Sequence, residues 1–335
     1  MQHGGDLSKA VQTYAIEKWK WMDLSTGVNP NGYAIERLPQ SCFEKLPDSQ
    51  ELTALAEAAR RAYQVPDTQG LIAAPGSEFL IQALPQTRSL SKVAILGPTF
   101  SSHEAGWRRY GHQVRLISQL DEIDDETVVV IVNPNNPDGR VLKPGQIKKL
   151  AGELLKRGGL LVIDEAFVDV MPEVSFVPKE PLENVVILRS IGKFFGLAGV
   201  RLGFAVGPNR LLDPLRESLG AWAVSGPAIA IGTEVLNDRD WQEQTRSVLR
   251  LQARQHRDVY EGYGVKIVGG TPLFQLIEVD DARKVHHELA KRAVWTRLFD
   301  YNTNWLRVGL CKTQTDLRQF ADRLETVLRL SQKAA

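Results

Sequence analysis

The sequence predicts an α/β protein: a mostly parallel β-sheet flanked by helices, together with a smaller second domain. Three observations support this fold class. Short apolar runs recur along much of the chain, a stretch with helical periodicity separates two of them, and 335 residues exceed the usual size of one small domain. We therefore expect one large domain and one smaller domain.

Apolar runs with the length of buried strands recur along the chain, and each is bounded by polar or turn residues. They cover residues 93–96, 128–132, 160–163, 185–188 and 203–206. Apolar positions within residues 147–155 follow helical spacing, and Gly158-Gly159 then provides a stop signal. A strand, a helix and a further strand in this order predict a parallel strand pair covered by a helix.

The C-terminal third has a different pattern, which indicates the second domain. An amphipathic stretch over residues 241–260 precedes an expected Gly-rich turn at Gly269-Gly270 and a strand-like run over 273–279. Helical patterns follow over residues 282–294 and 315–330. We predict an N-terminal segment that joins the small domain, then a large domain and a small domain, with the boundaries 1–40, 41–210 and 211–335.

Composition and charge exclude several classes of function. The formal net charge is +1 and both signs are scattered, so no basic surface for a nucleic acid is expected. No apolar run reaches the length of roughly 18 residues that spans a membrane, and the first twenty residues carry charges without an apolar core, so we expect no signal peptide. Cys42 and Cys311 are too few for a disulfide framework and lack metal-ligand spacing. We expect a cytoplasmic protein that binds a small molecule, with no metal, membrane or nucleic acid.

Polar residues follow several of the expected strands, at the edge where open α/β sheets bind their ligands. Residues 133–139 follow one run, Asp164 another, and residues 189–193 a third. Arg201 comes eight residues after Lys193. Taken singly, each has an ordinary interpretation: Asp164 could cap a helix, Lys193 could be solvated, and Arg201 could form a surface ion pair. Their combination is what predicts a site.

The block Ser190-x-x-Lys193 with Arg201 resembles the signature of the fold-type I aminotransferase family, and the resemblance extends from about Gly27 to Leu310. Members of this family use pyridoxal 5'-phosphate. The resemblance implies a large domain with a mostly parallel seven-stranded sheet and a smaller α+β domain. It also implies a homodimer, because the sites of this fold lie at the subunit boundary.

The resemblance gives roles to residues near the cofactor ring. Lys193 would condense with the cofactor aldehyde, and Asp164 would keep the pyridine nitrogen protonated, so that electrons released at the substrate Cα can enter the ring. Asn136 would donate a hydrogen bond to the ring oxygen O3'. Phe100 would stack on the ring, although on its own it reads more simply as a core phenylalanine.

The cofactor phosphate requires hydrogen-bond donors and positive charge. Ser190 and Arg201 would supply a hydroxyl and a guanidinium, and Gly76, Ser77 and Glu78 would offer backbone amides at the start of a helix. The Gly-Ser-Glu triplet alone is weak support. Its weight comes from its position before the strand run that ends ahead of Phe100, where the family has its phosphate loop.

Two positions depart from the family pattern. Phe167 stands where many aminotransferases have a tyrosine that donates to O3', which would leave Asn136 as the principal donor to that oxygen. Leu46 stands where relatives have a tyrosine that reaches the cofactor phosphate of the neighbouring subunit. The sequence therefore leaves open how a second subunit completes the site.

Substrate-binding residues are expected near the two ends of the chain. Arg307 matches the arginine that binds the substrate α-carboxylate in the family, and its fork suits a carboxylate. Asn29 lies in the segment that closes over the substrate in relatives. His3, followed by Gly4-Gly5, resembles the opening of the branch that decarboxylates L-threonine O-3-phosphate, in which the histidine contacts the substrate phosphate. A histidine so near a chain terminus is otherwise usually irrelevant to function.

This branch predicts the reaction, which converts L-threonine O-3-phosphate into (R)-1-amino-2-propanol O-phosphate during cobalamin biosynthesis. Two alternatives stay open: an aminotransferase similar to histidinol-phosphate aminotransferases, and a non-catalytic binding protein that kept the fold. The sequence does not distinguish loss of CO₂ from loss of a proton. That choice depends on which Cα bond stands perpendicular to the cofactor ring.

Overall fold

The computed structural model describes residues 4–177 and 183–332, which form two compact units. The first unit joins the N-terminal segment through Asn31 to Pro137–Gly139 and to the C-terminal part from Gln244. The second unit holds Gly32–Asn136 and Arg140–Glu243. These units are groups of contacting residues, so the domain boundaries at residues 40 and 210 stay a prediction.

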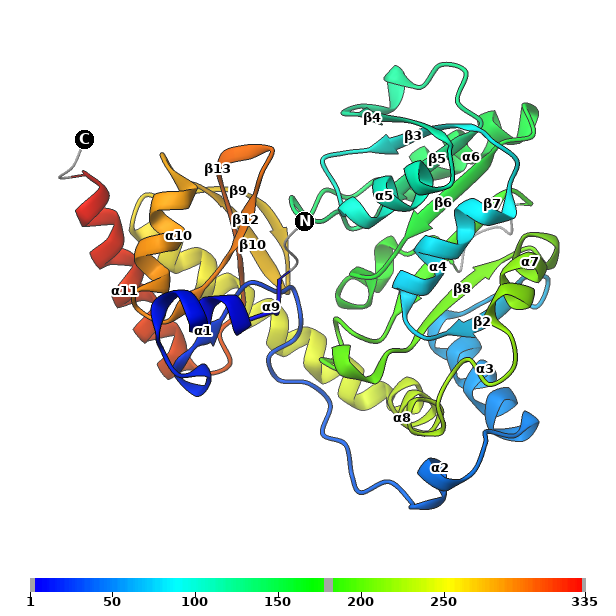
Figure 1. The fold of residues 1–335 in the computed structure, drawn as a ribbon, viewed down its shortest axis with the longest axis horizontal. Helices are drawn as coiled ribbons and strands as arrows, with labels where there is room; N and C mark the ends of the chain where they lie inside the picture. Colours follow the sequence, from blue (N-terminus) through cyan, green and yellow to red (C-terminus); the bar gives the residue numbers. More distant parts are fainter. Residues whose placement is uncertain (1–3, 178–182, 333–335) are drawn as a thin grey trace. The chain divides into compact units, whose positions relative to one another are not determined.

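A seven-stranded sheet forms the centre of the second unit (Figure 1), with the strand order β2-β8-β7-β6-β5-β3-β4. Its strands are β2 (Gly70–Ala74), β3 (Lys92–Leu96), β4 (Gln113–Ile117), β5 (Val128–Val132), β6 (Leu160–Asp164), β7 (Val185–Ser190) and β8 (Gly203–Gly207). The neighbours from β4 to β7 pair in parallel, whereas β8 runs antiparallel to β2 and β7. The predicted mostly parallel, seven-stranded sheet is confirmed.

Helices flank this sheet, and different helices pack on its two faces. One core cluster joins even-numbered residues of β6 and β7 to side chains of three helices, α4 (Ser77–Ala83), α5 (Ser101–Arg109) and α7 (Asn209–Leu219). Tyr63 contacts the opposite side of β7 through Arg189. The remaining helices of this unit are α2 (Ser41–Glu44), α3 (Ser49–Tyr63), α6 (Pro144–Lys156) and α8 (Gly226–Asn237).

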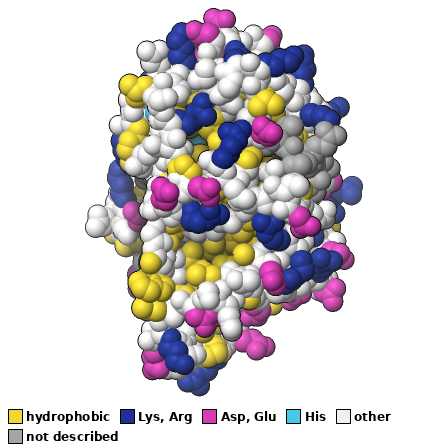
Figure 2. All heavy atoms as spheres, turned by 90° about the vertical axis from the view of Figure 1, so that its right-hand side faces the viewer, with side chains coloured by type: hydrophobic (Ala, Val, Ile, Leu, Met, Phe, Trp, Pro, Cys, Tyr) yellow, Lys and Arg dark blue, Asp and Glu magenta, His cyan; other side chains and the backbone are white. Residues whose placement is uncertain are grey.

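One face of the second unit carries a patch of hydrophobic atoms that charged side chains surround (Figure 2). Large hydrophobic side chains that are exposed in this unit include Phe43, Leu46, Leu90 and Trp222. Within the described residues, we find no helix whose length and hydropathy would allow it to cross a membrane.

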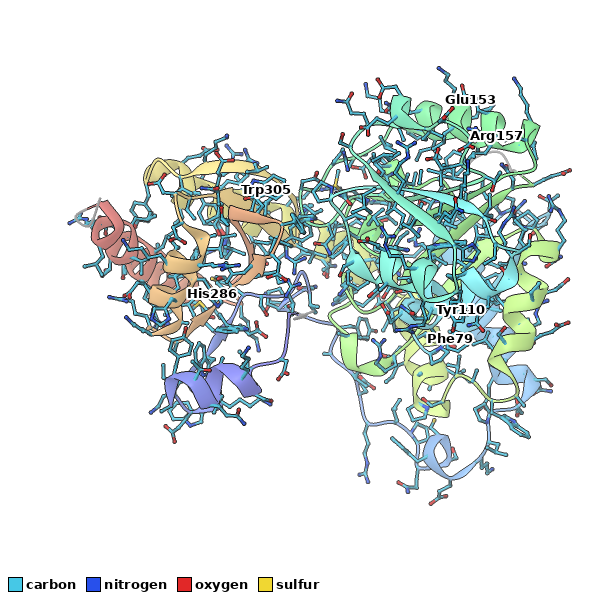
Figure 3. All side chains as sticks on the ribbon, turned by 45° about the horizontal axis from the view of Figure 1, so that its top comes forward. Phe79, Tyr110, Glu153, Arg157, His286 and Trp305 are labelled. Atoms are coloured by element: carbon cyan, nitrogen blue, oxygen red, sulfur yellow. The ribbon has the colours of Figure 1, made fainter. Side chains whose placement is uncertain are left out.

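Helix α6 shows how the sequence pattern determines the packing. Ile147, Leu150, Ala151 and Leu154 are buried, whereas Leu155, which the same periodicity includes, is 42% exposed. Glu153 and, just after the helix, Arg157 are also exposed (Figure 3). Pro144 suits the first position of the helix because its missing N–H would have no intrahelical partner there. The predicted strand, helix, strand unit is therefore present as β5, α6 and β6.

The first unit contains a four-stranded antiparallel sheet of order β12-β13-β10-β9. Its strands are β9 (Lys266–Thr271), β10 (Phe274–Glu278), β12 (Arg297–Phe299) and β13 (Asn302–Gly309). A second, parallel pair joins β1 (Met22–Asp23) to β11 (Val294–Trp295). The N-terminal segment therefore packs with C-terminal elements.

Helices α10 (Ala282–Ala290) and α11 (Gln314–Gln332) share an apolar core with this antiparallel sheet. His286 lies in α10 and Trp305 in β13 (Figure 3). The unit also contains α1 (Ser8–Tyr14), and α9 (Arg239–Gly262) begins in the second unit and ends in the first. Short 3₁₀ helices complete the described elements: η1 (Lys18–Lys20), η2 (Leu84–Thr87), η3 (Leu120–Glu122), η4 (Val168–Val170), η5 (Pro172–Val174) and η6 (Ala198–Val200).

Two local expectations for the first unit were wrong. Gly269-Gly270 do not form a turn but lie inside β9, where a Cβ on Gly269 would stand 2.1 Å from the carbonyl oxygen of Asp138. Glycine is needed there because another backbone segment approaches closely. The helix expected over residues 282–294 ends at Ala290, since Val294 pairs with β1 instead.

Candidate active site

The carboxyl ends of β5, β6 and β7 gather predicted cofactor residues at one edge of the sheet. Asp164 is the last residue of β6, and Ser190 is the last residue of β7. Directly after β5, the backbone N–H of Asn133 donates to the carbonyl oxygen of Asp164 at 2.8 Å. The structure thus brings these three strand ends together, while the roles of the residues toward a cofactor stay predictions.

Asp164 is held in one orientation by its neighbours. Its Oδ1 accepts a hydrogen bond from the backbone N–H of Ala166 at 2.9 Å, and its Oδ2 lies 2.9 Å from Nε2 of His103. Asp164 is 3% exposed and His103 is 1% exposed. Buried polar groups are costly unless they are hydrogen-bonded, and these contacts satisfy the carboxylate. The pair therefore presents a fixed carboxylate at the end of β6.

Sequence reasoning missed His103. The signal was its spacing, because His103 follows Phe100 by three residues: Phe100 is the N-cap of α5, and His103 lies in its first turn. Their ring centroids are 6.3 Å apart in an edge-to-face arrangement. A histidine one helical turn after the predicted stacking aromatic is therefore a position that sequence periodicity could have identified.

The predicted phosphate-binding residues meet where α4 begins. Gly76 precedes the helix with a φ of +87°, a conformation that favours glycine. A Cβ on Gly76 would lie 2.5 Å from Nη2 of Arg201, and a Cβ on Gly203 would lie 2.4 Å from the backbone nitrogen of Ser77. Both glycines therefore allow Arg201 and β8 to approach this loop closely.

The donors at this loop suit a phosphate group. Nη1 of Arg201 donates to the carbonyl oxygen of Ala198 at 3.0 Å, which fixes the exposed guanidinium. Ser190 Oγ accepts from the backbone N–H of Gly192 at 3.2 Å, so its own O–H can donate elsewhere. A hydroxyl, a guanidinium and backbone amides around a cradle without a Cβ fit the phosphate of the expected cofactor. The side chain of Glu78 accepts from Nε2 of Gln82 at 2.9 Å, and only its backbone amide is predicted to contact the phosphate.

Lys193 lies just beyond β7 and is half-buried. Its Nζ is 5.7 Å from the ring centroid of Phe167, which is 5% exposed. The structure therefore brings the predicted cofactor lysine near the residue that replaces the family tyrosine. Phe167 offers no hydroxyl, as the sequence already indicates.

The loops that carry Phe100 and Asn136 are joined by hydrogen bonds. Thr99 Oγ1 donates to Oδ1 of Asn135 at 2.6 Å, and Nδ2 of Asn135 donates to the carbonyl oxygen of Pro98 at 3.0 Å. Phe100 and Asn136 are both half-buried. The buried side chain of Asn135 thus holds together two loops on which predicted ring contacts depend.

In the first unit, Arg307 lies in β13 with 6% of its surface exposed. Its Nη2 donates to the carbonyl oxygen of Ser25 at 2.7 Å, and its Cζ lies 5.2 Å from the ring centroid of Phe274. Burial lowers the pKa of Arg307 to about 10, and the positive charge of Arg297 acts in the same direction. A buried guanidinium in this setting gains from an anionic ligand.

Arg297 is a second arginine that sequence reasoning missed. It lies in β12 directly opposite Arg307 of β13, so both side chains belong to the same face of the sheet. Burial also lowers the pKa of Arg297. Like charges directly opposite each other are destabilising, and a negatively charged ligand would relieve this repulsion. The register of the two strands, which the sequence does not contain, creates the pair.

The N-terminal segment reaches the backbone that Arg307 contacts. The N–H of Gly5 donates to Oγ of Ser25 at 2.9 Å, and a Cβ on Gly4 would lie 2.4 Å from the carbonyl oxygen of Ser25. That oxygen is the one that accepts from Arg307. Asn29 is 3% exposed, and its Oδ1 accepts from the N–H of Asn31 at 2.9 Å. The predicted residue His3 lies outside the described residues.

Comparison with known proteins identifies similar sequences over nearly the whole chain. A threonine-phosphate decarboxylase of Pseudomonas aeruginosa is 38% identical over 315 residues, which cover 92% of this chain and 93% of that protein. A second threonine-phosphate decarboxylase, from Sinorhizobium sp, is 37% identical over 330 residues, which cover 96% of this chain and 97% of its own.

The fold agrees with a solved structure. The histidinol-phosphate aminotransferase of Sinorhizobium meliloti, solved in complex with pyridoxal-5'-phosphate, superposes with a TM-score of 0.82 at 16% sequence identity. The superposition covers 97% of this chain and 95% of that one. The family model described as aminotransferase class I and II matches residues 20–324. The chain therefore belongs to the class I and II aminotransferase family.

Proposed function

We propose that this protein is a pyridoxal 5'-phosphate enzyme that decarboxylates L-threonine O-3-phosphate and releases (R)-1-amino-2-propanol O-phosphate for cobalamin biosynthesis. The observation that carries the proposal is the similarity, over more than nine tenths of the chain, to two threonine-phosphate decarboxylases. The chemistry at the edge of the seven-stranded sheet supports the cofactor, because a lysine, a fixed carboxylate and a set of phosphate donors occur there together.

Within this proposal, the second unit holds the cofactor. Ser190, Arg201 and the backbone amides of Gly76, Ser77 and Glu78 bind the phosphate, and Lys193 forms the covalent bond. Asp164, oriented by His103, keeps the proton on the ring nitrogen. Asn136 donates to O3' and Phe100 covers the ring. When bound, the cofactor accepts the electron pair that the broken Cα bond leaves behind.

The first unit supplies the proposed contacts to the substrate. Arg307 binds the α-carboxylate and Asn29 supports it, while His3 contacts the substrate phosphate. Arg297 adds a second positive charge opposite Arg307, which suits a substrate that carries both a carboxylate and a phosphate. Lys193, which takes up the proton of the substrate amine when that amine displaces it from the cofactor, would donate this proton to Cα after CO₂ has left.

The proposal includes a homodimer. Phe43, Leu46 and Trp222 are 63%, 66% and 59% exposed, so these large hydrophobic side chains are accessible to a second subunit. Helix α2, which carries Phe43, packs on the start of α8, because a Cβ on Gly226 would lie 2.3 Å from the carbonyl oxygen of Cys42. The hydrophobic patch of Figure 2 lies in the same unit. Gel filtration of a fully active monomer would contradict the dimer.

A cytoplasmic location is also proposed. Cys42 and Cys311 form no disulfide, which suits a reducing compartment.

The reaction is tested with the holoenzyme and L-threonine O-3-phosphate in the absence of any keto acid, by measuring CO₂ and the amine product. Release of both supports the decarboxylase. Turnover of histidinol phosphate that depends on 2-oxoglutarate would select the aminotransferase instead. An unchanged visible spectrum with both substrates would select the non-catalytic binding protein.

A further inference from the structure

A buried group of charged side chains lies directly behind the cofactor edge, and the proposed reaction does not use it. It consists of Glu165, Asp169 and Arg189, which are 0%, 4% and 3% exposed and are called the Glu165 cluster below. Arg189 Nη1 donates to Oε2 of Glu165 at 3.1 Å, and Arg189 Nη2 forms an ion pair with Asp169. Glu165 also accepts from Oγ of Ser175 at 2.8 Å and from the N–H of Phe176 at 2.6 Å.

Two members of the Glu165 cluster are chain neighbours of predicted cofactor residues. Glu165 follows Asp164, and Arg189 precedes Ser190. The N–H of Glu165 donates to the carbonyl oxygen of Leu188 at 2.9 Å, which continues the parallel ladder of β6 and β7. The ion pair between Glu165 and Arg189 therefore bridges the same two strand ends that carry Asp164 and Ser190.

The Glu165 cluster and the cofactor residues lie on opposite faces of these strands. Successive residues of a strand point to opposite faces, and even-numbered residues of β6 and β7 belong to the core packed against α4 and α5. The contact of Asp164 with His103 of α5 agrees with this assignment. Arg189 points the other way, where its Cζ lies 3.9 Å from the ring centroid of Tyr63.

The Glu165 cluster links two segments of the chain through directional, charged hydrogen bonds. The planar guanidinium of Arg189 bonds to two carboxylates from different segments, since Glu165 follows β6 and Asp169 lies in η4. Directional charged hydrogen bonds constrain geometry more strongly than apolar contacts do. Buried ion pairs are no better for stability than well-packed hydrophobic residues, so stability alone does not account for three charges here.

We propose that the Glu165 cluster is a positioning device for the cofactor. By fixing the ends of β6 and β7 relative to each other, it sets the spacing between the carboxylate of Asp164 and the hydroxyl of Ser190. In the proposed site these groups hold the ring nitrogen and the phosphate, so a change in their spacing weakens cofactor binding and alters the surroundings of the ring. This inference rests on the cofactor and not on which substrate bond breaks.

The test uses the variant Glu165→Gln, which keeps the size of the side chain but removes the charge that pairs with Arg189. We expect the dissociation constant of pyridoxal 5'-phosphate, measured from cofactor loss on dilution of the holoenzyme, to rise about tenfold or more, as when partners that orient metal ligands are removed. We also expect the pH midpoint of the visible absorbance of the bound cofactor to shift by about half a unit or more.

The matched control is Asn184→Ala, at the other end of β7. Asn184 is 4% exposed, and its Nδ2 donates to the carbonyl oxygens of Ala151 at 2.9 Å and Gly159 at 3.2 Å. Its loss removes buried hydrogen bonds beside the same strand but does not touch Asp164 or Ser190. We expect a lower melting temperature, with the cofactor dissociation constant and the pH midpoint close to those of the unmodified holoenzyme.

If Glu165→Gln lowers the melting temperature as the control does and leaves the dissociation constant and pH midpoint unchanged, the Glu165 cluster is merely structural and the proposal is overturned. Should this variant not fold, Ser175→Ala is measured instead, because it removes a hydroxyl that donates to Glu165 and accepts from Nη1 of Arg189, and it leaves all three charges. A raised dissociation constant in Ser175→Ala supports the proposal, and an unchanged one overturns it. Neither readout uses the substrate, so the proposed reaction can fail independently.

Discussion

At the scale of single residues, the pair Asp164 and His103 shows how burial fixes a side chain at the carboxyl end of β6. Asp164 and His103 are both buried and lie 2.9 Å apart, so each supplies the polar contact that burial demands of the other. Because an ionised carboxylate can only accept, Nε2 of His103 donates in this pair. In the proposed site, His103 thereby fixes the orientation of the Asp164 carboxylate.

We predict that His103→Leu lowers kcat/KM for CO₂ release about tenfold or more, because the buried carboxylate loses a hydrogen bond worth roughly 1–3 kcal/mol. The measurement is steady-state kinetics at saturating cofactor. His112→Leu is the matched control, since His112 is also buried and bonds to the carbonyl oxygen of Pro85 at 2.9 Å, away from Asp164. Equal kcat/KM values for the two variants would refute the role given to His103.

At the scale of elements, the strand runs could be predicted because burial on both faces leaves continuous apolar stretches. The five strands expected in the large domain are present as β3, β5, β6, β7 and β8, each within a few residues of its predicted bounds. Gly269-Gly270 misled the prediction, because a glycine pair marks a close backbone approach as readily as a turn. Arg297 was missed because its position opposite Arg307 depends on strand register.

The junction between β2 and α4 gives a prediction at this scale. Gly76→Ala combines a strained backbone at φ +87° with a Cβ that would lie 2.5 Å from Arg201. We expect a loss of stability of about 1–2 kcal/mol and, in addition, weaker retention of the cofactor by the holoenzyme. Thermal melting and equilibrium dialysis measure the two effects.

Gly158→Ala separates strain from the clash. Gly158 has a φ of +65°, and a Cβ there would meet nothing within 4 Å. This control should lose stability in the same way but keep its cofactor. If Gly76→Ala also retained the cofactor as tightly as the unmodified protein, the phosphate loop would be placed wrongly.

At the scale of the whole molecule, contacts distant in sequence define the two units. Pro137–Gly139 belongs with the C-terminal part because β9 carries glycines against that segment, and the N-terminal segment belongs there through β1 and β11. No local pattern contains the contact between Pro137–Gly139 and β9, so the sequence could not reveal it, whereas we did predict that the N-terminal segment joins the small domain. The family resemblance, in contrast, indicated the cofactor residues of the sheet edge, since their spacing along the chain is itself a signature.

The stability of the whole chain should depend on pH through two buried histidines. Burial lowers the pKa of His256 and of His286 from 6.5 to about 4. Between pH 6.5 and pH 4 the unfolded chain therefore binds more protons than the folded chain. The free energy of unfolding keeps its full value above pH 6.5 and falls as the pH drops toward 4. At pH 5 each histidine lowers the free energy of unfolding by about 2 kcal/mol.

Urea unfolding at pH 7 and pH 5 measures this loss. The variant His286→Gln, which cannot titrate, should lose about 2 kcal/mol less than the unmodified chain between the two pH values. An equal loss in both proteins would exclude His286 as a source of acid sensitivity.

The proposed function depends on a covalent bond between Lys193 and pyridoxal 5'-phosphate. Borohydride makes such a bond permanent, so treatment of the holoenzyme followed by proteolysis and mass spectrometry reports which lysine carries the cofactor. We expect one labelled peptide, with the cofactor mass on Lys193. A label on another lysine, or no label on a holoenzyme that contains the cofactor, would contradict it.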